Sequence, residues 1–114
     1  MSSTIIRGGT VFDGTGSDGR RADVLIHDGV VARIDHDIEV GPDVEVVDAD
    51  GCWVTPGFID LHAHWSAPGE LLQPESTNPF ANLAMGVTTV RDPQVTPDIF
   101  GLADIIEADQ VPGP

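Results

Sequence analysis

The sequence predicts a mixed fold, in which a small β-sandwich over residues 1–55 is followed by alternating strands and helices over residues 56–114. Two observations predict this division. Short apolar runs separated by glycine-containing turns fill the first half of the chain, which is typical of a small sandwich or meander. From Pro56 onward the pattern changes to strand, loop and helix, repeated twice, which is typical of α/β proteins.

Glycine-containing dipeptides define the turns of the first half. Gly8-Gly9 and Asp28-Gly29 each lie between two apolar runs. Such dipeptides favour the two-residue turns of β-hairpins because they tolerate positive φ. Two further strands are expected over residues 44–47 and 52–54, with Asp50-Gly51 as the turn between them.

The second half alternates between strand and helix patterns. After a loop rich in Pro, Ser and Gly, residues 79–85 have helix composition, with Asn78 as the expected N-cap and Gly86 as the stop. Residues 87–90 are β-branched throughout, as expected for a buried parallel strand. A second helix is expected over residues 98–107.

The apolar run from Phe58 to Leu61 ends in two histidines separated by one small residue. Side chains alternate faces along a β-strand, so Asp60, His62 and His64 are expected to point the same way. Imidazoles at positions i and i+2 can then converge on one cation at the ~2.0–2.1 Å that Zn–N bonds require. The spacing therefore predicts a strand that carries a metal-binding pair, His62 and His64, with two incidental histidines as the alternative.

Three stretches of the chain resemble one known family. Pro56-Gly-Phe-Ile-Asp-Leu-His-Ala-His64 resembles the first-strand signature of the amidohydrolase superfamily, metal-dependent hydrolases built on a (β/α)8 barrel. Residues 11–16 resemble the N-terminal segment of these enzymes, and residues 86–92 resemble their second barrel strand. The last stretch and the tryptophan after the His pair are most similar to the imidazolonepropionase-like and prolidase-like branch, while dihydroorotase-like and deaminase members remain open.

The resemblance implies a fold that is larger than this chain. A (β/α)8 TIM-type barrel takes about 250 residues. Residues 56–114 therefore have room for only the first two β/α units, and the barrel is incomplete in this chain. We expect the chain to be the N-terminal part of a longer protein, with residues 1–55 forming a separate β-domain.

The resemblance also implies the chemistry. Members bind one or two divalent metal ions, most often zinc, and the first-strand histidines, here His62 and His64, hold one of them. The metal activates a water molecule that hydrolyses an amide or cyclic amide C–N bond in a small-molecule substrate. The other ligands and the catalytic aspartate come from later strands. No catalytic residue is therefore assignable in this chain, which is expected to be inactive alone.

Four further residues lie near the predicted metal pair. Asp60 is expected either to orient a histidine ring or to bond to the backbone. Trp65 follows the pair and either contacts substrate or covers the barrel mouth. Arg91 and Asp92 end the second strand, where they either touch substrate or form an ion pair that holds the loop.

The composition limits the partners. Five Arg, no Lys and nineteen acidic residues give a net charge of −14, which excludes nucleic acid and disfavours an anionic membrane surface because both require a basic face.

Residues 14–19 match G-x-G-x-x-G, but a strand pattern follows in place of the helix N-terminus that a dinucleotide needs. The single cysteine, Cys52, excludes an internal disulfide and is expected to be buried. No signal-like or membrane-spanning apolar segment is found, so a cytoplasmic location is expected.

The alternative to an enzyme is a non-catalytic protein. Residues 1–55 would then serve as a β-rich interaction or oligomerisation module, and His62 and His64 would be vestigial. An incomplete barrel would also expose a sheet edge and apolar helix faces, which favours self-association, so a homo-oligomer is among the expected partners. Further metal ligands downstream would distinguish the enzyme from this alternative.

Overall fold

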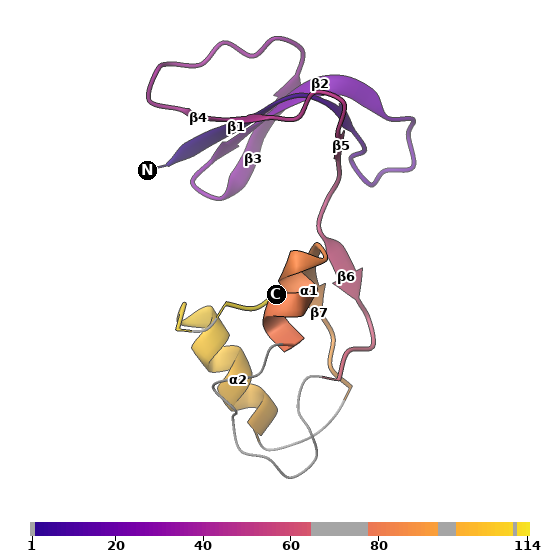
Figure 1. Ribbon diagram of the computed structural model, residues 1–114, viewed down its shortest axis with the longest axis vertical. Helices are drawn as coiled ribbons and strands as arrows, with labels where there is room; N and C mark the ends of the chain where they lie inside the picture. Colours follow the sequence, from indigo (N-terminus) through magenta and orange to yellow (C-terminus); the bar gives the residue numbers. More distant parts are fainter. Residues whose placement is uncertain (1, 65–77, 94–97, 111) are drawn as a thin grey trace. The chain divides into compact units, whose positions relative to one another are not determined.

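The computed structural model describes residues 2–64, 78–93, 98–110 and 112–114. The chain divides into two compact units, Met1–Pro56 and Gly57–Pro114, and each is considered by itself (Figure 1). None of the helices in the described ranges is long and apolar enough to cross a membrane.

The first unit contains one five-stranded mixed sheet (Figure 1). Its strands are β1 (Ser3–Val11), β2 (Arg20–His27), β3 (Val30–Asp35), β4 (Glu45–Asp48) and β5 (Trp53–Val54). Strand β1 is long enough to pair antiparallel with β2 along one side and parallel with β4 and then β5 along the other. The predicted β-rich character is confirmed. The described strands of this unit nevertheless form a single sheet, and not the two facing sheets of the predicted sandwich.

The hairpin predicted at Asp28-Gly29 is confirmed. Strands β2 and β3 pair antiparallel, with His27 opposite Val30 next to the turn. Asp28 and Gly29 have φ of 49° and 78°, so both central residues adopt the positive φ that a two-residue turn of type I′ requires. Strand β2 also begins at Arg20, directly after the Gly14–Gly19 segment, which confirms that no helix follows that glycine pattern.

The hairpin predicted at Gly8-Gly9 is wrong, because both glycines lie inside the continuous strand β1. The register passes from Ile6 opposite Val24 to Gly9 opposite Ala22, so Arg7 and Gly8 together face the single residue Asp23. This two-against-one arrangement is a β-bulge, and Gly8 adopts the positive φ of 74° that such a bulge favours. The turn-forming property of glycine is thus used within a strand and not between two strands.

The second strand pair also differs from the prediction. Asp50-Gly51 does form a turn, closed by the Cys52 N–H donating to the Ala49 carbonyl at 2.9 Å. The strands on either side of this turn pair with β1 and not with each other. Cys52 is exposed, and not buried as expected, although its carbonyl accepts the Thr10 N–H of β1 at 2.9 Å directly before β5.

The core of the first unit is built mainly on strands β1 and β2. Ile5 is completely buried, and Val11, Ala22 and Val24 form a buried cluster. Partly buried apolar residues pack against this cluster: Ile6, Ile26, Ile34 and Val54. Burial of these side chains is the main stabilising contribution to the unit.

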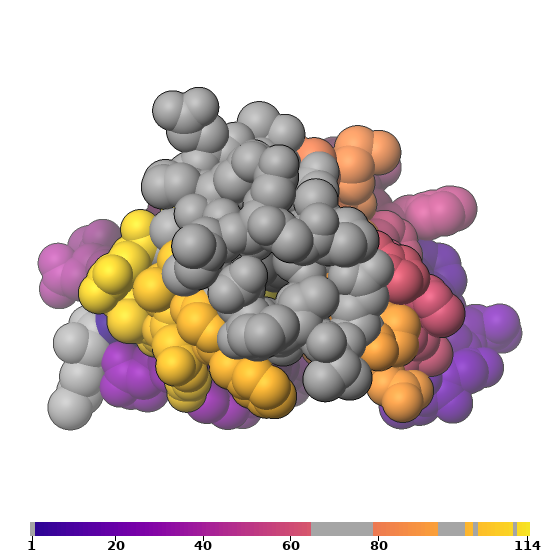
Figure 2. Space-filling model, turned by 90° about the horizontal axis from the view of Figure 1, so that it is seen from below, coloured from indigo at the N-terminus to yellow at the C-terminus, as the bar shows by residue number. Residues whose placement is uncertain are grey.

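The second unit alternates strands and helices in the order expected. Strand β6 (Phe58–Asp60) pairs parallel with β7 (Val87–Val90), and helices α1 (Asn78–Ala84) and α2 (Asp98–Glu107) are the other elements. The predicted stop at Gly86 is confirmed by its φ of 84° and by its N–H donating to the Leu83 carbonyl at 2.9 Å. Part of α2, coloured amber to yellow, is visible at the surface in Figure 2.

Candidate metal centre

The two strands of the second unit are joined beyond their assigned ends by two backbone hydrogen bonds. The Arg91 N–H donates to the Asp60 carbonyl at 2.7 Å, and the Ala63 N–H donates to the Arg91 carbonyl at 3.0 Å. A regular parallel ladder would leave one residue between the two partners of Arg91. Here there are two, Leu61 and His62, so the first strand bulges at these two residues, between Asp60 and Ala63.

This bulge corrects the prediction that both histidines lie on the strand. Strand β6 ends at Asp60, His62 lies in a bend, and His64 follows in irregular backbone. Ala63 between them is buried, at 6% exposure, while both histidines are exposed. The two imidazole centroids are 5.0 Å apart, with their planes inclined at 44°. The pairing of the rings that the i, i+2 spacing predicted is therefore present, although the backbone is not a regular strand.

The separation of the two rings fits a shared cation. A zinc ion about 2.1 Å from a ring nitrogen is roughly 3.2 Å from the ring centre, so two imidazoles of a tetrahedral site have centroids roughly 5 Å apart. Two nitrogen donors are half of such a site. Within the described ranges, no group of three or more His, Cys, Asp or Glu side chains is placed to hold a metal ion.

Asp60 makes one of the two contacts that the sequence left open. Its carboxylate Oδ1 accepts the backbone N–H of His62 at 2.9 Å. The acceptor two residues before its donor is the arrangement of an Asx-turn. Asp60 therefore bonds to the backbone of His62.

The other predicted residues are placed as follows. Arg91 and Asp92 come directly after β7, with Arg91 exposed and Asp92 half-buried. Arg91 lies opposite Leu61 and His62, since its backbone bonds to Asp60 and Ala63 on either side of them. Trp65 lies outside the described residues.

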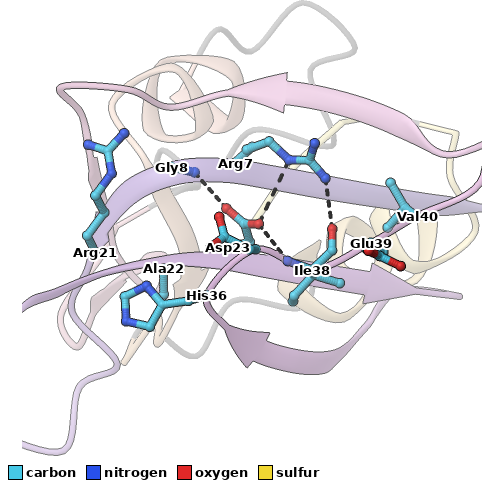
Figure 3. A pocket seen from close by; sticks show the side chains of 10 residues that line it. Arg7, Gly8, Arg21, Ala22, Asp23, His36, Ile38, Glu39 and Val40 are labelled. Atoms are coloured by element: carbon cyan, nitrogen blue, oxygen red, sulfur yellow. Dashed lines mark hydrogen bonds and ion pairs between the residues drawn. The ribbon is translucent and has the colours of Figure 1, made fainter.

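The first unit contains a pocket that sequence reasoning missed. It has a volume of about 760 Å³ and lies between the bulge of β1, strand β2 and the segment after β3 (Figure 3). Its lining residues are Arg7, Gly8, Arg21, Ala22, Asp23, His36, Asp37, Ile38, Glu39 and Val40. The one available signal was an aspartate, Asp23, within an otherwise apolar strand pattern.

Asp23 is the centre of the polar contacts in this pocket. Its carboxylate is buried and accepts the backbone N–H groups of Gly8 at 2.9 Å and Ile38 at 3.0 Å. Arg7 lies beside it, with Nε 3.8 Å from Asp23 Oδ2, and also donates to the Ile38 carbonyl at 2.9 Å. These contacts tie the segment after β3 to the bulge, so we interpret Asp23 as a structural residue.

The chain is 44% identical over 87 residues to a dihydroorotase of Thermoanaerobacter sp. (strain X514), which covers 75% of this chain and 20% of the relative. The solved structure of a D-hydantoinase is 35% identical with a TM-score of 0.69, over 93% of this chain and 23% of that chain. A Xaa-Pro dipeptidase structure has a TM-score of 0.80 at 22% identity, over 99% of this chain and 32% of that chain, which shows likeness of fold alone. No protein-family model matches the chain.

These similarities confirm the resemblance to the amidohydrolase superfamily that the three sequence stretches indicated. The chain spans about a fifth of the length of the curated relatives it matches. The relatives reported by sequence are dihydroorotases, one of the alternatives that the sequence left open, while the solved neighbours include the dipeptidase and the hydantoinase.

Proposed function

We propose that the protein containing this chain is a metal-dependent amidohydrolase that hydrolyses a C–N bond in an amide or cyclic amide. The observation that carries the proposal is the pair of imidazoles 5.0 Å apart beyond the end of two parallel strands. The names of the relatives support it, since a dihydroorotase and a D-hydantoinase point to cyclic amides as the substrate class.

The proposal assigns β6 and β7 to the first two strands of a (β/α)8 barrel, with α1 and α2 as the helices that follow them. Parallel pairing of the strands and their alternation with helices support this assignment. Active sites of such barrels lie at the C-terminal ends of the strands, which is where the two histidines are found. Residues 1–55 would form the separate β-domain, and the rest of the barrel would come from sequence outside this chain.

In this proposal His62 and His64 hold a divalent ion, most simply zinc, through one nitrogen of each neutral ring. The ion supplies a bound water of lowered pKa and an electrophile for the substrate carbonyl. Trp65, Arg91 and Asp92 are the candidates in this chain for contact with substrate. The remaining ligands and the general base would come from later strands, so the 114-residue chain alone would not turn over substrate.

The partners follow the same reasoning. We propose a small-molecule substrate and no nucleic-acid or membrane partner, in line with the net charge of −14. A homo-oligomer and a cytoplasmic location remain predictions of the sequence.

The test replaces the histidines one at a time in the full-length protein. His62→Ala and His64→Ala should each lower bound zinc and abolish hydrolysis of a panel of cyclic amides that includes a dihydroorotate-type and a hydantoin-type ring. The matched control is His27→Ala, because His27 is an exposed histidine of the first unit that contacts Ser3 and Asp28. This control should keep the zinc content and the activity of the unmodified protein.

Two results would contradict the proposal. Full zinc content in both histidine variants would show that the pair does not bind the metal. An intact protein with neither zinc nor hydrolytic activity would instead favour the non-catalytic β-rich module with vestigial histidines.

A further inference from the structure

We propose that Asp60 is a positioning residue that sets the separation of the His62 and His64 rings by holding the His62 peptide inside the bulge. The inference rests on the proposed metal centre. It assigns Asp60 a role through the backbone, and not through a histidine ring.

The first step is the hydrogen-bonding requirement of the bulge. The backbone ladder passes from the Asp60 carbonyl to the Ala63 N–H, both bonded to Arg91. The N–H of His62 lies between these two points, and Asp60 Oδ1 accepts it at 2.9 Å. The carboxylate thus replaces the ladder partner that the bulge removes.

The second step is that the two histidines have different anchors. Ala63 is buried and bonded to Arg91, and this fixes the backbone directly before His64. The backbone of His62 is fixed by a different contact, in which its N–H donates to the Asp60 side chain. The neighbouring Leu61 is 68% exposed and so adds little packing to hold the segment. Loss of the Asp60 contact would therefore release His62 while His64 stays in place.

The third step links this release to metal binding. Two ligands bind one ion more tightly when their spacing is set before the ion arrives, since the ordering cost is then already met. The 5.0 Å separation of the rings is the spacing that a shared ion needs. Groups that orient metal ligands typically change metal affinity by about 10–100-fold when they are removed.

Two substitutions separate a backbone role from a charge effect. Asp60→Asn keeps an oxygen in the same position and can form the same Asx-turn, but it removes the charge. Asp60→Glu keeps the charge, but its longer side chain cannot close the same turn. If Asp60 anchors the backbone, Asp60→Asn should keep the metal affinity and Asp60→Glu should lower it. If the carboxylate instead acts by its charge on a ring or on the ion, the reverse is expected.

The experiment measures Co²⁺ binding to the metal-free full-length protein by its visible absorption, together with amide hydrogen exchange at His62. Asp60→Ala and Asp60→Glu should bind Co²⁺ roughly 10–100-fold more weakly, with an altered spectrum and faster exchange at His62. Asp60→Asn should stay within about threefold of the unmodified protein, below the range expected for a lost orienting group. His62→Ala is measured in parallel.

Each outcome decides between the claims. Equal Co²⁺ affinity in the Asp, Asn and Glu proteins, or weaker binding by Asn than by Glu, overturns the role of Asp60. Unchanged Co²⁺ binding by His62→Ala overturns the metal centre itself, whatever the Asp60 variants do. The comparison of Asn with Glu still decides the question where the Ala variant does not fold.

Discussion

Asp23 lies opposite the bulge of β1, and its buried Oδ1 accepts the backbone N–H of Gly8 at 2.9 Å. The other oxygen of the same carboxylate accepts the Ile38 N–H at 3.0 Å. One side chain thus satisfies the donor exposed by the bulge and also fixes the segment that follows β3. The relation resembles that of Asp60 and His62, where a carboxylate again accepts a backbone N–H at an irregular point of a strand.

The first prediction is that Asp23→Ala destabilises the first unit by about 2–4 kcal/mol, because it leaves two backbone donors without their acceptor and Arg7 without its counter-charge. The stability of Asp23→Asn should lie between that of the unmodified protein and that of Asp23→Ala, since the amide has only one oxygen that can accept a hydrogen bond. Urea unfolding of the full-length protein, followed by hydrogen exchange at Gly8 and Ile38, measures the effect. The control Asp18→Ala, at an exposed loop position, should change stability by less than about 0.5 kcal/mol. Equal stability of Asp23→Ala and this control would contradict the prediction.

A second prediction concerns the close approach of β1 and β5. A Cβ added at Gly9 would lie 2.5 Å from Val54 Cγ2 and 3.1 Å from Ala49 Cβ. Gly9→Ala should therefore cost about 1–3 kcal/mol of unfolding free energy through overpacking. Gly41→Ala is the matched control, because a Cβ there meets no atom within 4 Å. Thermal unfolding of the two variants should separate them clearly, and a neutral Gly9→Ala would show that β5 does not pack against this glycine.

The fold was predictable from the sequence where local rules determine it. The turn at Asp28-Gly29 depends on two adjacent residues, so its sequence pattern was sufficient. Gly8-Gly9 has the same local character, but its conformation depends on Asp23, which is distant in sequence. Pairing of β4 and β5 with β1 is likewise non-local, because the choice of partner depends on the register of the whole sheet.

The candidate site shows the same division. The spacing of His62 and His64 was enough to predict that their rings lie together. The bulge at Leu61 and His62 was not predictable, since it is visible only in the hydrogen bonds to Arg91 on the neighbouring strand. For this reason the sequence left two roles open for Asp60, and only the backbone geometry distinguishes between them.

The third prediction concerns acid stability. The hydrogen bond from Arg33 is the main reason why the pKa of Asp35 is lowered from its ordinary value of 3.8, with smaller contributions from the His36 N–H and from the charge of Arg33. A lowered folded-state pKa means that this contact stabilises the fold above the ordinary pKa and that the contribution is lost as the pH falls through the folded-state value. Arg33→Ala should raise the pKa of Asp35 toward 3.8 in a carboxyl NMR titration of the protein. An unchanged Asp35 titration in this variant would show that Arg33 is not the cause.

The last prediction uses the backbone of Arg91 to test how the two strands of the second unit are held together. The N–H of Arg91 donates to the Asp60 carbonyl at 2.7 Å, and this bond lies directly before the bulge that carries His62. Arg91→Pro removes the donor, whereas Arg91→Ala removes only the side chain and keeps both backbone bonds. Arg91→Pro should therefore lower the zinc content of the full-length protein, while Arg91→Ala should keep it, whatever its effect on substrate affinity. Equal zinc content in the two variants, measured by elemental analysis of the folded proteins, would mean that the register of β6 against β7 does not position the histidines, and that the bulge alone is sufficient to hold them.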